Sequence, residues 1–151
     1  MVSYAEVLER SKRKSGTDFQ TSPINTPLSK RATWILANLN INANQTTVIF
    51  FAFAMASALV FPFGTPVAVV VAAAFYWIHV ILDYSDGDLA RYHQQFARNG
   101  EYWDHIIHLF TIPLIFGGIV LAEVRREAPD WVIAAGIVLI VTMALNRGLN
   151  D

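Results

Sequence analysis

The stretch "VAVVVAAAFYWIHVILDYSDGDLAR", residues 67–91, decides the fold. Its first sixteen residues contain no Asp, Glu, Lys or Arg, and three aspartates then follow within six positions. A helix of that length rises about 24 Å, which approaches the roughly 30 Å thickness of a bilayer's hydrocarbon core. The stretch therefore indicates a membrane span that ends in a cluster of carboxylates.

Apolar runs of the same kind recur along the chain. The 151 residues are 54% hydrophobic and 15% charged, which is more apolar and less charged than an ordinary soluble domain. A buried bundle in a soluble protein is the alternative, but helices without a polar face are hard to place in water. We therefore predict an all-α integral membrane protein with a bundle of four transmembrane helices. The predicted spans are about 46–63, 66–91, 101–122 and 130–147.

The N-terminal part has a different composition. Residues 1–26 form a polar tail that we expect to pack loosely. Residues 27–39, "PLSKRATWILANL", place Trp34 and Leu36 near Lys30, a pattern typical of an amphipathic helix that lies on a membrane surface. We predict a juxtamembrane helix here, at the start of a membrane domain that covers residues 27–151.

The basic residues indicate an orientation. With the N-terminus inside, nine of the 11 Lys and Arg side chains fall on the inner face, and Arg125 and Arg126 fall on the outer one. Basic residues concentrate on the cytoplasmic side of membrane proteins. Both termini and the 83–104 segment are therefore expected in the cytoplasm, at the cell membrane if the source is bacterial. The net charge of −1 argues against a nucleic-acid partner, and the absence of Cys excludes disulfides and thiolate metal sites.

The carboxylates after Leu82 fall on one side of a helix if the helix continues. At about 100° per residue, Asp83, Asp86, Gly87 and Ala90 lie within an arc of about 100°, with Arg91 at its edge. Asp88 points about 140° away and is expected to be solvated.

The next predicted helix carries Gly100, Asp104 and His108 at positions i, i+4 and i+8. If the two helices are antiparallel neighbours, three carboxylates and an imidazole meet at the cytoplasmic mouth. Such carboxylates repel one another unless cations neutralise them, and oxygen-rich clusters suit hard ions such as Mg²⁺. The alternative is a set of polar residues that merely cap the two spans.

The same helical face could receive a ligand. Gly87 and Ala90 leave room for a close approach to the backbone, and Arg91 could hold a phosphate.

The spacing resembles the signature of the CDP-alcohol phosphatidyltransferase family, D-x2-D-G-x2-A-R-x8-G-x3-D-x3-D. Each defined position is present except the last, where His108 replaces an aspartate. The matching residues are Asp83, Asp86, Gly87, Ala90, Arg91, Gly100 and Asp104. Upstream, "ANQTT" at 43–47 resembles the family's "PNQ-x-T" entry to the first span, with Ala43 in place of the proline.

The resemblance implies a reaction and its participants. Family members transfer a phosphatidyl or other phosphoalcohol group from a CDP-linked donor to an acceptor hydroxyl and release CMP, as in phospholipid biosynthesis. The implied partners are a CDP-linked lipid donor, an alcohol acceptor and the lipid bilayer. By resemblance, one or two divalent ions, Mg²⁺ or Mn²⁺, would bind Asp83, Asp86 and Asp104. The cytidine and phosphate pocket would involve Gly87, Ala90, Arg91 and Gly100. His108 would be the catalytic base that activates the acceptor hydroxyl.

Two departures from the family leave alternatives open. His108 adds no negative charge, which favours softer ions such as Mn²⁺ over Mg²⁺. The family has six transmembrane helices and this chain supplies four, so it is either truncated or completed by a partner such as a second copy in a homodimer. A non-catalytic member that binds metal and CDP-lipid is the main alternative. A cation carrier is less favoured because the carboxylates lie at the mouth of the bundle, whereas transporter sites lie near mid-span.

Overall fold

The computed structural model describes residues 2–12, 24–94 and 100–150, without the side chains of 100–104 and 147–150. Every regular element in these ranges is a helix, which confirms the all-α fold. The order along the described chain is α1 (Tyr4–Arg10), α2 (Asn25–Asn38), α3 (Ala43–Val60), the short 3₁₀ helix η1 (Phe61–Phe63), α4 (Pro66–Tyr92), α5 (Gly100–Arg125) and α6 (Asp130–Asn150).

Three helical segments of the described chain are long and apolar enough to cross a membrane: Ala43–Phe63, Pro66–Tyr92 and His105–Arg125. The part of α6 whose side chains the structure describes, Asp130–Asn146, is apolar but shorter. Large apolar side chains lie exposed on these helices, for example Val67 at 73% and Trp131 at 73%. Apolar surface of this extent suits a hydrocarbon environment.

The chain divides into two compact units. The first unit comprises Met1–Phe50 and Ile78–Glu101, and it holds α1, α2, the start of α3 and the end of α4. The second unit comprises Phe51–Trp77 and Tyr102–Asp151, and it holds the rest of α3 and α4 with η1, α5 and α6.

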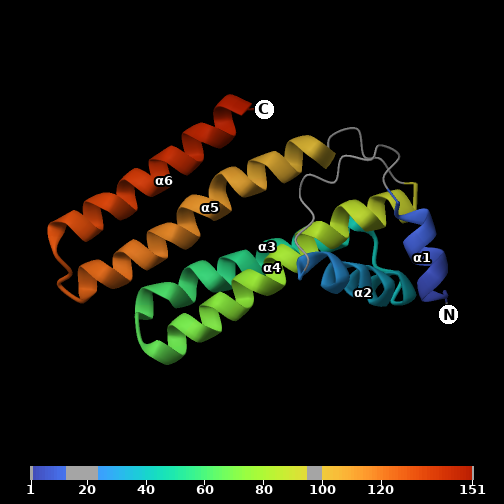
Figure 1. Ribbon diagram of the computed structural model, residues 1–151, viewed down its shortest axis with the longest axis horizontal. Coiled ribbons are helices and arrows are strands. Elements are labelled where there is room, and N and C mark those ends of the chain that lie inside the picture. The colour runs from blue at the N-terminus through green and yellow to red at the C-terminus, as the bar shows by residue number, and fades with distance from the viewer. Residues whose placement is uncertain (1, 13–23, 95–99, 151) are drawn as a thin grey trace. The chain divides into compact units, whose positions relative to one another are not determined.

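Helix α1 packs against α2 in the first unit (Figure 1). Val7 is buried at 1% exposure, the backbone N–H of Val2 donates to Asn38 Oδ1 at 2.8 Å, and Trp34 Nε1 donates to the carbonyl of Val2 at 3.0 Å. The core around this contact consists of Val7, Leu36, Ala37, Ala43 and Leu89. The expectation that the N-terminal segment packs loosely is therefore wrong for α1. The Val7 side chain packs in one core with residues of α2 and α4.

Small polar residues allow α2 to lie close to the end of α4. Ser85 is fully buried, and its Oγ lies 2.8 Å from the carbonyl of Ile81 and 3.1 Å from the carbonyl of Ser29 on α2. Small side chains of this kind let two helix backbones approach closely. Helix α2 thereby covers one face of the segment that carries the predicted site.

The start of α3 is a reciprocal cap. Gln45 N–H donates to Asn42 Oδ1 at 2.9 Å, and Asn42 N–H donates to Gln45 Oε1 at 3.0 Å. This exchange is the capping box, which satisfies two backbone donors that a helix start leaves without intrahelical partners. It fixes the first turn of α3 and, with it, the position of Thr47.

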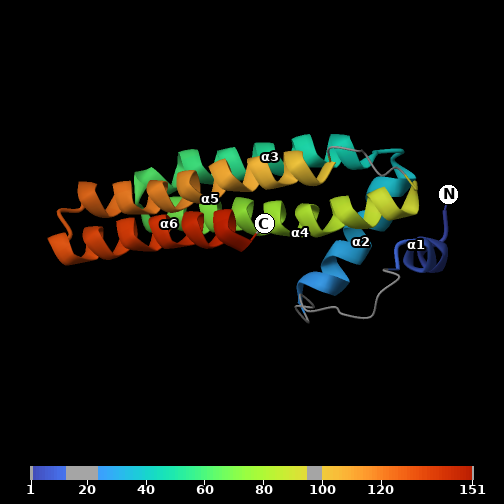
Figure 2. The same ribbon diagram turned by 90° about the horizontal axis from the view of Figure 1, so that it is seen from above.

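Helices α5 and α6 of the second unit run side by side as an antiparallel hairpin (Figures 1 and 2). At the other turn of this unit Gly64 adopts a φ of 66°, and Arg125 Nη1 donates to the carbonyl of Pro62 at 2.9 Å. Gly118 brings α5 against α3 and η1, since a Cβ at Gly118 would lie 2.9 Å from the carbonyl oxygen of Ala58. The core between these helices consists of Ala54, Phe61, Ala72 and Ile115.

Candidate active site

The two carboxylates of the predicted metal site lie on the last turns of α4. The helix is unbroken to Tyr92, so Asp83 and Asp86 are one turn apart on the same side, and both are partly buried. Thr47 Oγ1 lies 2.6 Å from Asp86 Oδ2 and 3.1 Å from the carbonyl of Ala43. A hydroxyl has one proton to donate, and the shorter contact to a charged acceptor is the stronger one. Thr47 therefore orients Asp86.

Gly87 and Arg91 share a face of α4. A Cβ at Gly87 would lie 3.6 Å from Arg91 Nη1 and 3.7 Å from Nη2, so the guanidinium lies over the bare backbone of the glycine. Ala90 packs against the core of the first unit. Gly87, Ala90 and Arg91 thus lie within the last two turns of α4, and of the three only Arg91 has a long side chain.

Asp88 is not solvated, contrary to the expectation from its position on the helix. It is 5% exposed, its Oδ2 lies 3.0 Å from Lys30 Nζ, and its Oδ1 accepts from Arg91 Nη2 at 2.5 Å. The helical geometry was right in directing Asp88 away from Asp83 and Asp86, but α1 and α2 cover the face to which it points. Asp88 is therefore the acceptor for two cations in the first unit.

Arg91 makes a second contact, with the N-terminal segment. Its Nε donates to the carbonyl of Ser11 at 2.9 Å, directly after α1 ends. Ser11 is fully buried, and Lys30 Nζ lies 3.5 Å from its Oγ. Ser11, Lys30, Asp88 and Arg91 form one polar cluster, called here the Asp88 cluster. Ser11, in the N-terminal segment, thus contacts Arg91, a residue of the family signature.

The second half of the predicted site lies on α5. The helix runs continuously from Gly100 to Arg125, so Gly100, Asp104 and His108 occupy one face of it. His108 belongs to the second unit and is 7% exposed, whereas the side chain of Asp104 lies outside the described residues. The convergence of these residues with Asp83 and Asp86 therefore stays a prediction.

The chemistry of the described ligands fits a hard cation. Among the side chains that the structure describes, no three His, Asp or Glu residues cluster as a metal site, and Asp104 of the predicted set is not one of them. Asp83 and Asp86 supply carboxylate oxygens one helical turn apart, which are the donors that Mg²⁺ and Mn²⁺ take in proteins.

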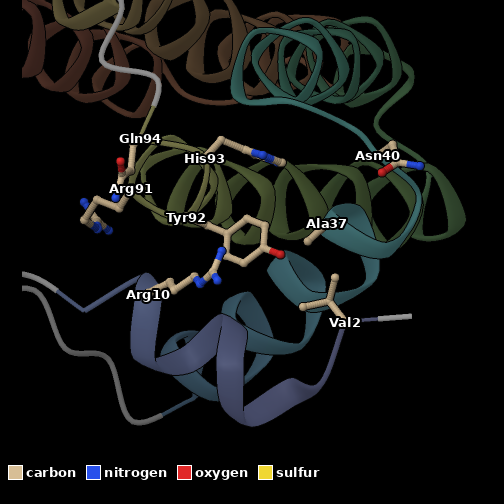
Figure 3. A pocket seen from close by; sticks show the side chains of 8 residues that line it. All are labelled: Val2, Arg10, Ala37, Asn40, Arg91, Tyr92, His93 and Gln94. Carbon is tan, nitrogen blue, oxygen red and sulfur yellow. The ribbon is translucent and has the colours of Figure 1, made fainter.

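A cavity of about 660 Å³ opens beside the Asp88 cluster, in the same unit. Figure 3 shows the Arg10 guanidinium next to the Tyr92 ring, with its Cζ 5.8 Å from the ring centroid, and the Arg91 side chain directed away from both. The lining residues are Val2, Arg10, Ala37, Asn40, Arg91, Tyr92, His93 and Gln94. Arg10 of α1 and the following Ser11 thus contact two consecutive residues of α4, Tyr92 and Arg91.

Sequence reasoning missed Ser11, Lys30 and Thr47 as neighbours of the site. Thr47 carried a signal, since it ends the "ANQTT" stretch, whose resemblance to the family suggested a constraint on that position. Lys30 carried none, because a lysine on an amphipathic helix ordinarily faces lipid headgroups or water.

Comparison with known proteins agrees with the signature. The family model for CDP-alcohol phosphatidyltransferase matches residues 34–149. The chain is 34% identical over 97 residues to a bifunctional IPC transferase and DIPP synthase of Archaeoglobus fulgidus. That alignment covers 64% of this chain and 19% of the relative, so the chain matches about a fifth of the relative's length. Since the family model covers most of the described helices, including the whole of α4 and α5, the chain belongs to the CDP-alcohol phosphatidyltransferase family.

Proposed function

We propose that the protein transfers a phosphatidyl or other phosphoalcohol group from a CDP-alcohol to an acceptor hydroxyl and releases CMP, as a step of phospholipid synthesis. The observation that supports this most is the placement of Asp83, Asp86, Gly87 and Arg91 on the partly buried end of α4. A lipid-linked nucleotide has to place its tail in the bilayer and its headgroup in water. The end of a membrane-spanning helix is where both environments meet.

Asp83, Asp86 and Asp104 would hold one or two divalent ions, Mg²⁺ or Mn²⁺. Bound there, such ions would neutralise charge on the donor's pyrophosphate. Thr47 keeps Asp86 in one orientation through its 2.6 Å hydrogen bond. A ligand that is already oriented loses less conformational entropy when a metal binds.

Arg91 would bind a phosphate oxygen of the donor, and Gly87 would let the donor approach the helix backbone. The acceptor oxygen forms a bond to the phosphorus that carries the lipid alcohol, and the bond from that phosphorus to the oxygen of CMP breaks. His108 would take the hydroxyl proton of the acceptor, and CMP leaves with the bonding electrons. A neutral imidazole is suited to this role because it can accept a proton near neutral pH.

We place this site at the cytoplasmic face, with both termini on the same side, because that orientation puts most basic residues inside. The donor would be a CDP-linked lipid and the acceptor an alcohol, and the surrounding bilayer would hold the lipid tails. A second copy of the chain is a candidate partner, in a homodimer.

The test incubates membranes that contain the protein with CDP-diacylglycerol, Mg²⁺ or Mn²⁺, and a panel of alcohols, and follows CMP release. We expect release that depends on both the metal and one of the alcohols, and its loss in Asp83→Asn and Asp86→Asn. One observation favours a second function, a non-catalytic protein that binds metal and CDP-lipid: the base position is occupied by His108, which is buried at 7% exposure. Metal-dependent binding of CDP-diacylglycerol without CMP release would support that second function.

A further inference from the structure

Arg91 has more hydrogen-bond donors than the described residues use. A guanidinium carries five N–H groups, one on Nε and two on each Nη. Nε donates to the carbonyl of Ser11 at 2.9 Å and Nη2 donates to Asp88 at 2.5 Å, while Nη1 has no hydrogen-bond partner among the described residues. The two contacts fix the plane of the guanidinium and leave one edge available.

The available edge lies over Gly87, on the side of the helix that carries Asp83 and Asp86. The closest atom to a Cβ at Gly87 would be Arg91 Nη1, at 3.6 Å. Because glycine has no side chain, nothing from position 87 stands between this nitrogen and a ligand. An anion bound beside Asp83 and Asp86 could therefore reach Nη1 while Nε and Nη2 keep their contacts.

The charges of the Asp88 cluster add to this effect. Asp88 carries one negative charge and is the acceptor for Lys30 and Arg91, so the cluster as a whole keeps one positive charge. Asp88 and Lys30 are shielded from solvent, with side chains 7% and 24% exposed. A positive charge in such a place attracts phosphate more strongly than one in open water.

Helix α1 is part of the same arrangement. The Ser11 carbonyl follows α1 directly, and Arg10 of α1 lies 5.8 Å from the Tyr92 ring centroid. Ser11 and Lys30 both lie before residue 34, outside the range that the family model matches. Ser11 nevertheless contacts Arg91, a residue of the family signature.

We propose that helix α1, whose C-cap Ser11 accepts from Arg91, acts with Lys30 of α2 and Asp88 of α4 to hold Arg91 ready for a phosphate of the CDP-alcohol donor. Docking of α1 and binding of the donor are then coupled and strengthen each other. This proposal rests on the proposed function, in that the phosphate belongs to a CDP-alcohol. Ser11, Lys30 and Asp88 are positioning residues, because each acts through Arg91.

The coupling can be measured from both sides in the full-length chain. The sequence has no cysteine, so Val7→Cys introduces a single thiol on α1 at a position that is 1% exposed in the folded protein. The rate at which a maleimide modifies this thiol reports how often α1 detaches from the core of the first unit. Saturating CDP-diacylglycerol should slow the modification, and undocking α1 should weaken donor binding by the same factor, because coupling free energies are reciprocal.

Lys30→Met keeps the length of the side chain and removes its charge, and Asp88→Asn keeps the shape of the carboxylate. In the Val7→Cys chain both should speed the modification and raise the KM for CDP-diacylglycerol about fivefold or more, with kcat less affected. Lys12→Met is the matched control, since Lys12 is exposed and makes no contact with Asp88 among the described residues. It should change neither quantity.

The outcomes separate the two proposals. If the parent chain binds CDP-diacylglycerol and releases CMP, but Lys30→Met and Asp88→Asn leave the donor KM at the value of Lys12→Met, the positioning role is refuted and the proposed function stands. A donor that speeds modification of the thiol would also refute it, since α1 would then compete with the donor. If the parent chain neither binds the donor nor releases CMP, the proposed function fails and the coupling fails with it. The thiol would still report whether the Asp88 cluster holds α1.

Discussion

Gly117 and Gly118 are neighbours on α5, and the structure predicts opposite effects when each is replaced by alanine. A Cβ at Gly118 would lie 2.9 Å from the carbonyl oxygen of Ala58, 3.2 Å from Phe61 Cβ and 3.2 Å from Pro62 Cδ. A Cβ at Gly117 would meet nothing within 4 Å. The first position lies against backbone and ring atoms that cannot rotate away, and the second has open space.

The magnitudes follow from two terms. Replacing glycine by alanine inside a helix stabilises the helix by about 1 kcal/mol, and this term is shared by both variants. Inserting a methyl group into a packed contact costs about 1 to 3 kcal/mol, and this term applies at Gly118 only. The difference between the two variants therefore isolates the packing term. We expect Gly117→Ala to be at least as stable as the parent protein and about 1 to 3 kcal/mol more stable than Gly118→Ala.

The assay is thermal unfolding in detergent micelles, followed by the fraction of protein that remains monodisperse. A difference of 1 kcal/mol corresponds to about 2 to 4 °C in Tm for a chain of this size. Gly136→Ala is a useful third variant: its Cβ would lie 2.6 Å from Val120 Cγ2, and a valine in a helix strongly prefers one χ1 rotamer. Gly136→Ala should therefore also be less stable than Gly117→Ala. Equal melting temperatures for Gly117→Ala and Gly118→Ala would refute the close packing of α5 against α3 and η1.

Three further predictions concern the candidate site, and a fourth concerns the membrane topology. Thr47→Val removes the hydrogen bond to Asp86 and should weaken Mn²⁺ binding about tenfold or more by calorimetric titration, whereas Thr47→Ser should retain it. Asp88→Asn leaves two cations facing each other at 24% and 22% side-chain exposure, so unfolding should become about 1 to 3 kcal/mol easier, less than for a fully buried pair. His108→Ala should lower the rate of CMP release about 10²- to 10⁴-fold and leave CDP-diacylglycerol binding intact, and an unchanged rate would assign His108 to packing. A reporter fused at Glu127 should lie on the outer side of the membrane, and a cytoplasmic signal there would contradict the four-span topology.

The helices of the membrane region could be predicted from composition because length and lack of charge are properties of a run of residues by itself. Helix α3 followed by η1 covers residues 46–63, α4 covers 66–91, and α3 starts a few residues before 46. That earlier start was also readable in principle. An Asn followed three residues later by Gln, as at Asn42 and Gln45, is the pattern of a capping box.

The position of a residue on a helix could be predicted, but its surroundings could not. Helical periodicity correctly directs Asp88 away from Asp83, and it contains no information about which other segment covers that side. Here the covering segments are α1 and α2, and their residues Ser11 and Lys30 lie far from Asp88 in the sequence. The packing of α2 against α4 depends on single contacts between small residues, such as Ser85 against Ser29. Such contacts do not produce a periodic pattern in the sequence.

The end of α4 carries carboxylates on two sides, and Arg91 can reach both. Asp83 and Asp86 supply negative charge on one side, and Asp88 supplies it on the other, where Lys30 and Arg91 contact it. Arg91 lies between them, bonded to Asp88 by Nη2 and adjacent to Gly87 by Nη1. A guanidinium that was not held by Asp88 and Ser11 could turn toward Asp83 or Asp86 and take the place of a metal ion. The contacts with Asp88 and Ser11 thus serve two purposes, because they keep the guanidinium from pairing with Asp83 or Asp86 and leave its Nη1 edge over Gly87 for a phosphate.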